Sequence, residues 1–336
     1  MSDPTMSDTS AINETAGRAG NDWRGIVRPR PSVVALGNFD GVHLGHRRIL
    51  DAVAAAAAEA GADAVALTFE PHPRQFLFPD AKTSLLTSPR EKTALIRALG
   101  VEPVTLAFDA SLAALEASGF VNDVLLGRLR GTRFFLGGDH RFGKGARGDA
   151  GLLRDLARRA LPESAADDPV VLVPPVIDGG EPVSSSAIRH HLKDGRIERA
   201  NALLDRAYAV RGTVVPGAAR GRLIGFPTAN LQPEDARKIL PFGVFGGFAV
   251  LDDGTRHVAL ANVGLRPTFN EPGPSLEVHL PGWSGDLYGR ALTFEFRTRL
   301  RPEQKFDSIE ALRDQIARDV ATWQDLAPTF PRLPRP

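Results

Sequence analysis

The pattern of apolar runs changes character near residue 205, and this change constrains the fold more than any other feature. Between Val33 and Val173, short apolar runs alternate with segments of helical composition. Strands that alternate with helices are joined by right-handed crossovers, so this half predicts a parallel sheet. After Tyr208 the runs are strand-like and follow one another directly, several with a period of two. Such a run of strands is typical of a small antiparallel barrel.

Each expected element has a range. The first half predicts strands at 33–36, 65–69, 103–108, 134–136 and 169–173. It predicts helices at 46–62, 91–99, 112–129, 150–161 and 186–204. The second half predicts strands at 209–215, 244–251, 256–262, 276–280 and 291–299, with a hairpin turn at Asp253-Gly254. Together these describe an α/β domain with a Rossmann-like parallel sheet, followed by a small antiparallel β-barrel.

A C-terminal helix is expected to close the barrel. Apolar side chains recur at spacings of three and four, at Ile309, Leu312, Ile316, Val320 and Trp323. This spacing is typical of one buried helix face, so we expect the stripe to pack against the barrel. The N-cap is expected at Asp307 or Ser308.

The length and these patterns divide the chain into four parts. Its 336 residues have room for about two domains. We expect a mobile polar arm at 1–30, the α/β domain at 31–205, the barrel domain at 206–328 and a tail at 329–336. The arm lacks the apolar core of a signal peptide, which favours a cytoplasmic protein.

Charge and cysteine content exclude several classes of function. The formal net charge is +1, so no clustered field of one sign predicts a nucleic acid or a membrane surface as partner. The absence of cysteine excludes disulfides, thiolate metal sites and a cysteine nucleophile, and it suits a reducing compartment. No apolar run reaches about eighteen residues, so we expect no membrane span. Nothing in the sequence indicates an oligomeric state.

The segment GNFDGVHLGH, from Gly37 to His46, is the most informative part of the first half. It joins a strand to a helix, at the sheet edge where ligands of open α/β folds bind. Gly41 and Gly45 let the backbone approach a ligand closely, and the helix start favours phosphate. His43 and His46 could both face one phosphate group and stabilise the charge that develops there.

Two other interpretations of this histidine pair need weighing. In the first, His43 and His46 are surface residues at a helix start, which the surrounding glycine frame disfavours. In the second, they bind zinc, although no third ligand or glutamate base accompanies them.

Three further segments of the first half carry chemistry: TFEPHP at 68–73, GDHRFG at 138–143 and VSSSAIR at 183–189. The phenylalanine and rigid prolines of the first offer a flat apolar wall, or else ordinary core and turn residues. The serines and arginine of the last open a helix, where hydroxyls, N–H groups and a guanidinium converge on an anion. Taken alone, that motif would favour a simple N-cap with a solvated arginine.

Together with GNFDGVHLGH, these segments resemble the adenylyltransferase module of the bacterial bifunctional riboflavin kinase/FMN adenylyltransferase family, which carries the HxGH signature of nucleotidyltransferases. The resemblance implies that His43, His46 and Arg189 are catalytic. It implies nucleotide binding by Gly37, Asn38, Phe39, Gly41, Gly45, Asp139, Ser185 and Ser186. It implies flavin binding by Phe69, Pro71, His72 and Pro73.

The second half has a glycine-rich loop, GRLIGFPTAN at 221–230, that enters a strand. Its glycines can lie over phosphates, and Thr228 and Asn230 offer two oxygens that point the same way, which suits hydrated magnesium. In the later strand LEVHL, Glu277 and His279 share one face, so either could be a general base. The alternative is a solvent-facing strand with its polar residues outward.

In order and spacing, these segments resemble the riboflavin kinase barrel of the same family: GxxxGxPTAN, NxGxxPTF at 262–269, and ExH followed by DLYG at 286–289. The resemblance implies that Glu277 is the catalytic base and that Thr228 and Asn230 hold Mg²⁺. It implies ATP binding by Gly221, Gly225, Pro227, Thr228 and Asn230. It also implies that ATP phosphorylates riboflavin to FMN, and that a second ATP adenylylates FMN to FAD with release of pyrophosphate.

Two rival functions remain to be weighed. The loop GKGARG at 143–148 matches GxGxxG and would suit a nicotinamide-dependent oxidoreductase. However, the turn before it is too long, and no acidic residue ends the next strand to receive a ribose hydroxyl. The other rival function is that of a flavin-binding protein with inactive sites. The presence of His43, His46 and Glu277 argues against it.

The chain departs from the family pattern at four places. His140 stands where phenylalanine is usual, and Ser186 replaces threonine. Asp205 stands where glycine is common, and GWS at 282–284 replaces a more acidic run. None of these changes removes a proposed catalytic group.

Overall fold

The computed structural model describes residues 20–81, 84–161, 168–217, 220–265 and 274–331. Among these, the residues of 1–38, 49–82 and 93–174 form one compact unit, and those of 39–48, 83–92 and 175–336 form a second. The expected arm and tail lie partly outside the described residues, as does the motif at 262–269. The domain boundary expected between residues 205 and 206 stays a prediction.

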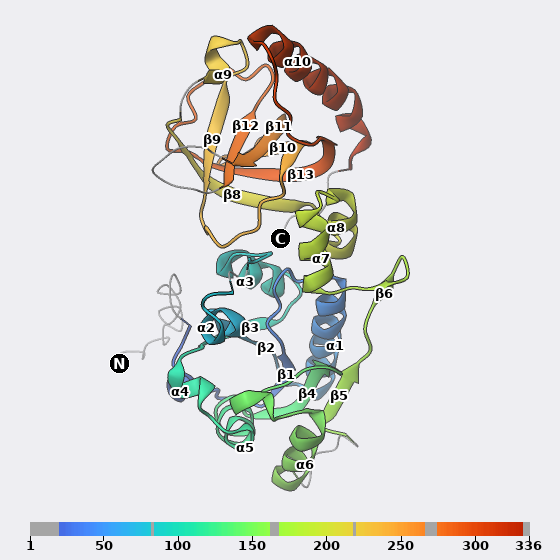
Figure 1. Ribbon diagram of the computed structural model, residues 1–336. Coiled ribbons are helices and arrows are strands. Elements are labelled where there is room, and N and C mark those ends of the chain that lie inside the picture. The colour runs from blue at the N-terminus through green and yellow to red at the C-terminus, as the bar shows by residue number, and fades with distance from the viewer. Residues whose placement is uncertain (1–19, 82–83, 162–167, 218–219, 266–273, 332–336) are drawn as a thin grey trace, which may run out of the picture. The chain divides into compact units, whose positions relative to one another are not determined.

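Five parallel strands form the sheet of the first unit (Figure 1). In chain order they are β1 (Ser32–Leu36), β2 (Asp63–Glu70), β3 (Glu102–Ala107), β4 (Gly131–Gly137) and β5 (Val170–Val173). Across the sheet their order is β3-β2-β1-β4-β5. From β1 the chain first adds strands on one side of the sheet (β2 and β3) and then on the other (β4 and β5), so the direction changes between β1 and β4. Ligands of open α/β sheets bind at such a point, beyond the carboxyl ends of the strands. The sheet confirms the prediction from alternating strands and helices.

Helices bury both this sheet and their own apolar faces. The long ones are α1 (Leu44–Ala60), the π-helix η2 (Phe120–Arg128) and α6 (Ala150–Ala160). The apolar side chains of η2 and α6 share a core with Val34 and Leu36 of β1 and with Val65 and Leu67 of β2. Shorter elements are η1 (Trp23–Gly25), α2 (Pro73–Leu77), α3 (Pro89–Arg97), α4 (Ala110–Ala113), α5 (Ala117–Gly119) and η3 (Lys144–Ala146).

The helix predicted at 112–129 is wrong as a single element. It is divided into α4, α5 and η2. At the break, the amide of Lys144 donates to the carbonyl of Leu115 at 2.8 Å. Gly143 approaches so closely that a Cβ there would lie 2.5 Å from the Cα of Ala117. The carbonyl of Leu115 thus bonds to a distant loop at the point where the helix is interrupted, and the close approach of Gly143 occupies the space beside Ala117.

Six antiparallel strands close the barrel of the second unit (Figure 1). They are β8 (Tyr208–Val215), β9 (Thr228–Pro233), β10 (Gly243–Leu251), β11 (Arg256–Leu265), β12 (Pro274–His279) and β13 (Ala291–Arg301). The order around the barrel is β10-β11-β12-β9-β8-β13. This confirms the predicted barrel, whose five expected strands all form, and β9 forms where the glycine-rich loop was expected to enter a strand.

Helix α10 (Ile309–Leu326) lies along the outside of the barrel, drawn in red in Figure 1. Ser308 is its N-cap and accepts a hydrogen bond from the amide of Ala311. Trp323 is fully buried, and its Nε1–H donates to the carbonyl of Gly247 at 2.9 Å. Ile309 was expected in the packed stripe but is 64% exposed, because it starts the helix beyond the barrel contact. A short helix, η4 (Ala327–Thr329), follows.

The helix predicted at 186–204 is also interrupted. It forms as α7 (Ser185–Lys193) and α8 (Ile197–Leu204), preceded by the hairpin β6 (Ile177–Asp178) and β7 (Glu181–Pro182). Gly195 has a φ of +70°, a left-handed conformation that ends α7. Asp205 ends α8 in the same region, with a φ of +54°. Glycine adopts this conformation most easily, which gives a physical reason for the glycine that the family commonly has there.

Among the residues that the structure describes, no helix is long and apolar enough to cross a bilayer.

Candidate active sites

The segment between β1 and α1 makes a tight turn with three left-handed residues. The φ angles are +50° at Phe39, +88° at Gly41 and +39° at Val42. The φ of Gly41 favours glycine, and a Cβ there would also lie 2.8 Å from Cδ1 of Leu86. The ring of Phe39 is fully buried and packs edge-on against the ring of His46, with centroids 5.2 Å apart. The turn thus brings both motif histidines to the start of α1.

The two histidines stack on each other, and a backbone hydrogen bond fixes the tautomer of His43. Their ring centroids are 3.6 Å apart, with an interplanar angle of 16°. The amide of His46 donates to Nδ1 of His43 at 3.3 Å, so the proton of the neutral His43 ring is on Nε2. Nδ1 of His46 is buried without a hydrogen-bond partner in the described part of the chain. An unsatisfied buried nitrogen is unusual in proteins and is compatible with a ligand-binding site.

Both histidines are neutral at physiological pH. Burial is the main cause that lowers the pKa of His43 to about 4, and it is aided by Arg206 and Arg189 and opposed by Asp40. Burial also lowers the pKa of His46 well below its ordinary value, with a further contribution from His43. The pair can therefore stabilise a developing anion as N–H donors, without carrying a positive charge itself.

Asp40, which sequence reasoning did not single out, organises this site. Its carboxylate accepts from the amides of Leu86 and Thr87, each at 3.0 Å, and from the Thr87 hydroxyl at 3.1 Å. It also accepts from the guanidinium of Arg189. A carboxylate that is only 3% exposed needs such partners. The only sequence signal for it is its place between Phe39 and Gly41.

The α7 motif lies beside Asp40 in the second unit. Ser185 donates to the Asp40 carbonyl at 2.8 Å, and Nε of Arg189 donates to the carbonyl of Ser84 at 2.8 Å. The N-cap of the helix is Ser184, whereas Ser186 is exposed in the first turn. The structure therefore brings His43, Arg189 and Ser185 together around Asp40, and it gives the guanidinium a carboxylate partner rather than solvent.

The predicted flavin residues belong to the first unit. The ring of Phe69 packs edge-on against Phe108 at 5.7 Å, and Phe76 packs against the same ring at 5.6 Å. His72 is the N-cap of α2, with Nδ1 accepting from the amide of Arg74 at 3.1 Å. Sequence reasoning missed Phe76 and Phe108, which extend the aromatic wall. The other predicted residues that fall in the first unit are Gly37, Asn38, Pro71, Pro73 and Asp139.

Packing accounts for the first and the last glycine of the GKGARG loop, whereas Gly145 has a left-handed φ of +64°. Gly143 lies against Ala117, as described above, and a Cβ at Gly148 would lie 2.4 Å from the ring of Phe142. Phe142 and Gly148 also exchange backbone hydrogen bonds at 3.1 and 2.9 Å. These close approaches require glycine without any phosphate, so the loop gives no support to a dinucleotide site.

In the barrel, strand register brings the three predicted kinase groups together. Strands β9 and β12 pair so that Asn230 lies opposite Glu277 and Thr228 lies opposite His279. The Thr228 hydroxyl donates to Oε2 of Glu277 at 3.5 Å. Leu276 and Val278 are buried while Glu277 is half-buried, which confirms the predicted alternation along β12. A hydroxyl, an amide and a carboxylate thus converge.

The glycine-rich loop folds back over the start of β9. The amide of Phe226 donates to the carbonyl of Gly221 at 2.8 Å, and a Cβ on Gly221 would lie 2.3 Å from the Phe226 oxygen. Gly225 has a φ of +85°. The loop contains a short helix, α9 (Arg220–Leu223), that the sequence did not indicate. Gly217 was also missed: a Cβ there would lie 1.9 Å from the Asn230 amide nitrogen.

His279 is bound to this loop, which separates its role from that of Glu277. Its Nδ1 lies 2.8 Å from the carbonyl of Pro227, and since a carbonyl only accepts, the proton is on Nδ1. Burial lowers the pKa of His279. Its ring packs edge-on against Phe226 at 5.5 Å. This arrangement makes His279 a support for the loop and leaves Glu277 as the carboxylate of the site.

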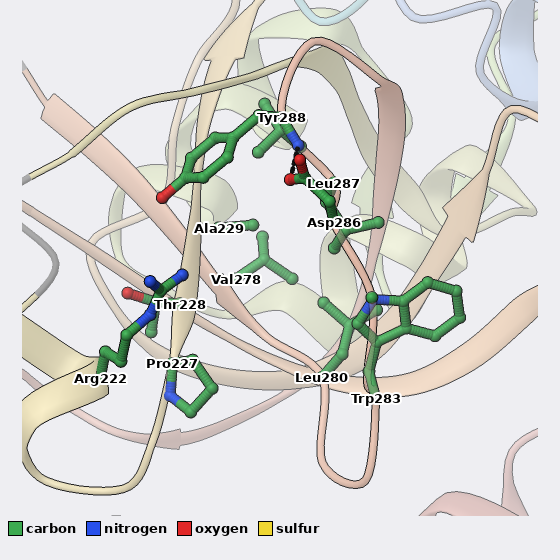
Figure 2. A pocket seen from close by; sticks show the side chains of 12 residues that line it. Arg222, Pro227, Thr228, Ala229, Val278, Leu280, Trp283, Asp286, Leu287 and Tyr288 are labelled. Atoms are coloured by element: carbon green, nitrogen blue, oxygen red, sulfur yellow. Dashed lines mark hydrogen bonds between the residues drawn. The ribbon is translucent and has the colours of Figure 1, made fainter.

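A cavity of about 100 Å³ opens beside Thr228 (Figure 2). It is lined by aromatic and aliphatic side chains with a few polar ones, among them Pro227, Leu280, Trp283, Tyr288 and Arg222. Figure 2 shows the hydroxyl of Tyr288 directed toward the side of the cavity where Thr228 and Arg222 lie. Nε1 of Trp283 is buried without a hydrogen-bond partner among the described residues. The sequence indicated this region only through DLYG and the unusual GWS.

Thr228, Asn230 and Glu277 offer oxygen ligands only, which is the donor set that Mg²⁺ prefers. No group of three histidine, cysteine, aspartate or glutamate side chains that could hold a metal ion occurs among the described residues. The oxygen atoms of Thr228, Asn230 and Glu277 fit a hard cation such as Mg²⁺, which usually keeps water and substrate phosphates among its ligands.

Two family models match the chain in succession. The model described as FAD synthetase matches residues 26–187, and the model described as riboflavin kinase matches residues 204–327. A bifunctional riboflavin kinase/FMN adenylyltransferase of Escherichia coli (strain K12) is 37% identical over 295 residues, which are 87% of this chain and 92% of the relative. The protein of the same name from Bacillus subtilis (strain 168) is 35% identical, over 86% of this chain and 90% of the relative.

One solved structure resembles almost the whole chain. It is a crystal structure described as a macrolide-efflux protein from Streptococcus pneumoniae, with a TM-score of 0.81 and 31% identity, covering 90% of this chain and 97% of that one. The likeness to that structure is one of fold. The two family models match in the same order as the two sets of motifs, and the curated relatives carry both names at once. The chain therefore belongs to the family of bifunctional riboflavin kinase/FMN adenylyltransferases.

Proposed function

We propose that the barrel phosphorylates riboflavin and that the residues around Asp40 adenylylate the resulting FMN. The observation that carries the first assignment is the register of β9 and β12, which places Asn230 opposite Glu277. Phosphoryl transfer depends mainly on positioning and charge neutralisation. The three side chains on paired strands supply the positioning, and the oxygen atoms that would hold Mg²⁺ supply the charge neutralisation through that cation.

In the kinase reaction, Glu277 accepts the proton of the riboflavin 5′-hydroxyl as that oxygen attacks the γ-phosphorus of ATP. The bond from the γ-phosphorus to the bridging oxygen breaks, and ADP leaves. Thr228 and Asn230 hold Mg²⁺, which neutralises charge on the phosphates when bound. The backbone at Gly221, Gly225 and Pro227 covers the ATP phosphates.

The cavity beside Thr228 takes the planar ring of one of the two substrates. Its aromatic and aliphatic walls suit a flat heteroaromatic group, and the unpaired N–H of Trp283 offers a donor to an acceptor at the ring edge.

In the adenylyl transfer, an FMN phosphate oxygen attacks the α-phosphorus of ATP in line, and pyrophosphate leaves with the electrons of the broken bond. His43 and His46 donate N–H hydrogen bonds to the charge that develops there, and Arg189 exchanges Asp40 for a phosphate oxygen. Ser185 and Ser186 contribute donors at the start of α7. Neutral imidazoles suit this role because they never repel the neighbouring arginines.

Other residues complete the adenylyl transfer proposal. The nucleotide is bound by the β1–α1 turn, from Gly37 to Gly45, and by Asp139. The isoalloxazine ring of FMN is bound by Phe69, Pro71, His72 and Pro73, beside the aromatic rings of Phe76 and Phe108. We assign residues 31–205 to adenylyl transfer and 206–328 to the kinase. The absence of cysteine favours a reducing compartment such as the cytoplasm.

Chromatography of flavins separates the two assignments. In Glu277→Gln, FMN formation from riboflavin should fall about 10²- to 10⁴-fold, while FAD formation from supplied FMN is unchanged. In His46→Ala, FAD formation should fall by a similar factor and FMN formation should persist. The matched controls are Glu310→Gln and His190→Ala, which change exposed side chains of α10 and α7. Normal riboflavin phosphorylation by Glu277→Gln would contradict the base assignment, and equal loss of both reactions in His46→Ala would contradict the division of labour.

A further inference from the structure

Lys238 forms a buried ion pair that neither reaction uses directly. It lies between β9 and β10, and its ammonium contacts both carboxylate oxygens of Glu91, at 2.6 Å from Oε1. Only 8% of Lys238 is exposed, and Nζ lies 5.2 Å from the centre of the Tyr208 ring. A charge taken out of water stays ionised only when its partner is held in place. The pair therefore fixes residue 91 to the segment at residue 238.

Backbone hydrogen bonds join the same two segments. The amide of Leu85 donates to the carbonyl of Arg237 at 2.8 Å, and the amide of Ile239 donates to the carbonyl of Leu85 at 3.0 Å. These bonds form a short parallel bridge between Leu85 and Lys238. The segment from 85 to 91 is thus attached at both of its ends to the chain between β9 and β10.

Glu91 also caps the N-terminus of helix α3. It lies in the first turn of α3, where its Oε2 accepts from the amide of Ser88 at 2.7 Å, and the Ser88 hydroxyl accepts from the amide of Glu91 at 3.2 Å. This reciprocal pair is a capping box, which defines where the helix begins. Lys238 therefore holds a carboxylate that in turn shapes the chain immediately after Thr87.

The residues just before Ser88 hold the turn that carries the histidines. The amides of Leu86 and Thr87 donate to Asp40, as described above, and the amide of Gly41 donates to the Thr87 hydroxyl at 3.0 Å. Arg206, just before β8, donates to the carbonyls of Gly41 and Val42. A continuous path of direct bonds thus runs from Lys238 to the turn that precedes His43.

We infer that Lys238 is a positioning residue for adenylyl transfer, although it lies in the part of the chain that forms the kinase barrel. It acts through Glu91, the segment 85–88 and Asp40 on the turn that carries His43 and His46. A misplacement of reacting groups by about 1 Å can cost about a hundredfold in rate. Loss of the ion pair should therefore slow adenylylation of FMN and leave phosphorylation of riboflavin unchanged. The inference rests on the proposed role of the two histidines.

The test uses the full chain and measures both reactions on each variant. In Lys238→Met, kcat for FMN adenylylation should fall roughly ten- to a hundredfold, with a smaller change in KM for ATP. Lys238→Arg, which keeps the charge and its contact with Glu91, should restore most of this loss. The matched control is Arg211→Met, because Arg211 is a barrel cation paired with an exposed carboxylate, Glu234.

Lys238→Met leaves the buried carboxylate of Glu91 without its partner, which could unfold the protein. The double variant Lys238→Met/Glu91→Gln removes that charge as well and so controls for unfolding. The glutamine side chain keeps the acceptor of the capping box without the charge. Selective loss of adenylylation in the double variant supports the inference. Equal loss of both reactions, or no loss of adenylylation in either variant, overturns it. His46→Ala, assayed in parallel, separates the two proposals: if it also leaves adenylylation intact, the histidine assignment itself fails.

Discussion

Burial decides the ionisation of His43, and this has a measurable consequence for stability. In the folded chain its pKa is about 4, against an ordinary value of 6.5 that the unfolded chain retains. Between these two values the unfolded state binds a proton that the folded state does not, so stability falls as the pH drops from about 6.5 toward about 4. The difference corresponds to about 3 kcal/mol of unfolding free energy, all of it retained above about pH 6.5.

Urea unfolding of the parent chain and of His43→Asn, at about pH 7.5 and about pH 5, measures this contribution. We expect the parent to lose more stability than the variant on acidification, because asparagine has no proton to take up. If the two proteins lost equal amounts, the pKa of His43 would not be lowered as its burial requires.

At this scale the sequence predicted the chemistry-bearing residues better than their partners. His43, Arg189, Thr228 and Glu277 were each indicated by their motifs together with the family resemblance, and their roles stay predictions. The contacts of Asp40 were not indicated, because its partners at 86–87 and 189 come from distant parts of the chain. No local pattern encodes a pairing of that kind.

Helix α10 depends on a glycine in the neighbouring strand. A Cβ at Gly246 of β10 would lie 2.4 Å from ring atoms of Trp323, which is fully buried and hydrogen-bonded to Gly247. Overpacking of this kind typically costs about 1–3 kcal/mol. We expect Gly246→Ala to lower the temperature at which riboflavin phosphorylation is inactivated.

Gly25→Ala is the control for this change, since nothing lies within 4 Å of the position where its Cβ would be. Adding Trp323→Phe to Gly246→Ala should recover part of the lost stability, because the smaller ring leaves room for the methyl group. A Gly246→Ala protein as heat-stable as its parent would show that the ring can move aside at no cost.

Helices and strands could be predicted where the apolar residues recur with one clear period. The predictions were wrong where a contact with a distant part of the chain interrupts an element. The strands of both units follow from apolar runs and alternation, and α10 follows from spacings of three and four. The break within 112–129 could not be predicted, because it depends on the bond from Lys144 to Leu115 and on the approach of Gly143. The chain before residue 130 contains no sign of either.

At the scale of the whole molecule, the sequence predicted two architectures but not how the chain is shared between them. Residues 39–48 and 83–92 precede strands of the parallel sheet in sequence, yet they cluster with the barrel. Secondary-structure patterns cannot reveal this, because it depends on buried pairs such as Lys238 with Glu91. The family resemblance reports the order of the modules and is equally silent on such pairs.

The lysine–glutamate pair also limits how far the two halves can be exchanged in protein engineering. A chimera joined near residue 205 takes Glu91 from one parent and its cationic partner from the other. We expect a chimera whose grafted barrel lacks a cation at position 238 to make FMN normally and to accumulate it, since conversion to FAD would be slow. Restoring a lysine at that single position should release the block, which the ratio of FAD to FMN in the product mixture would report.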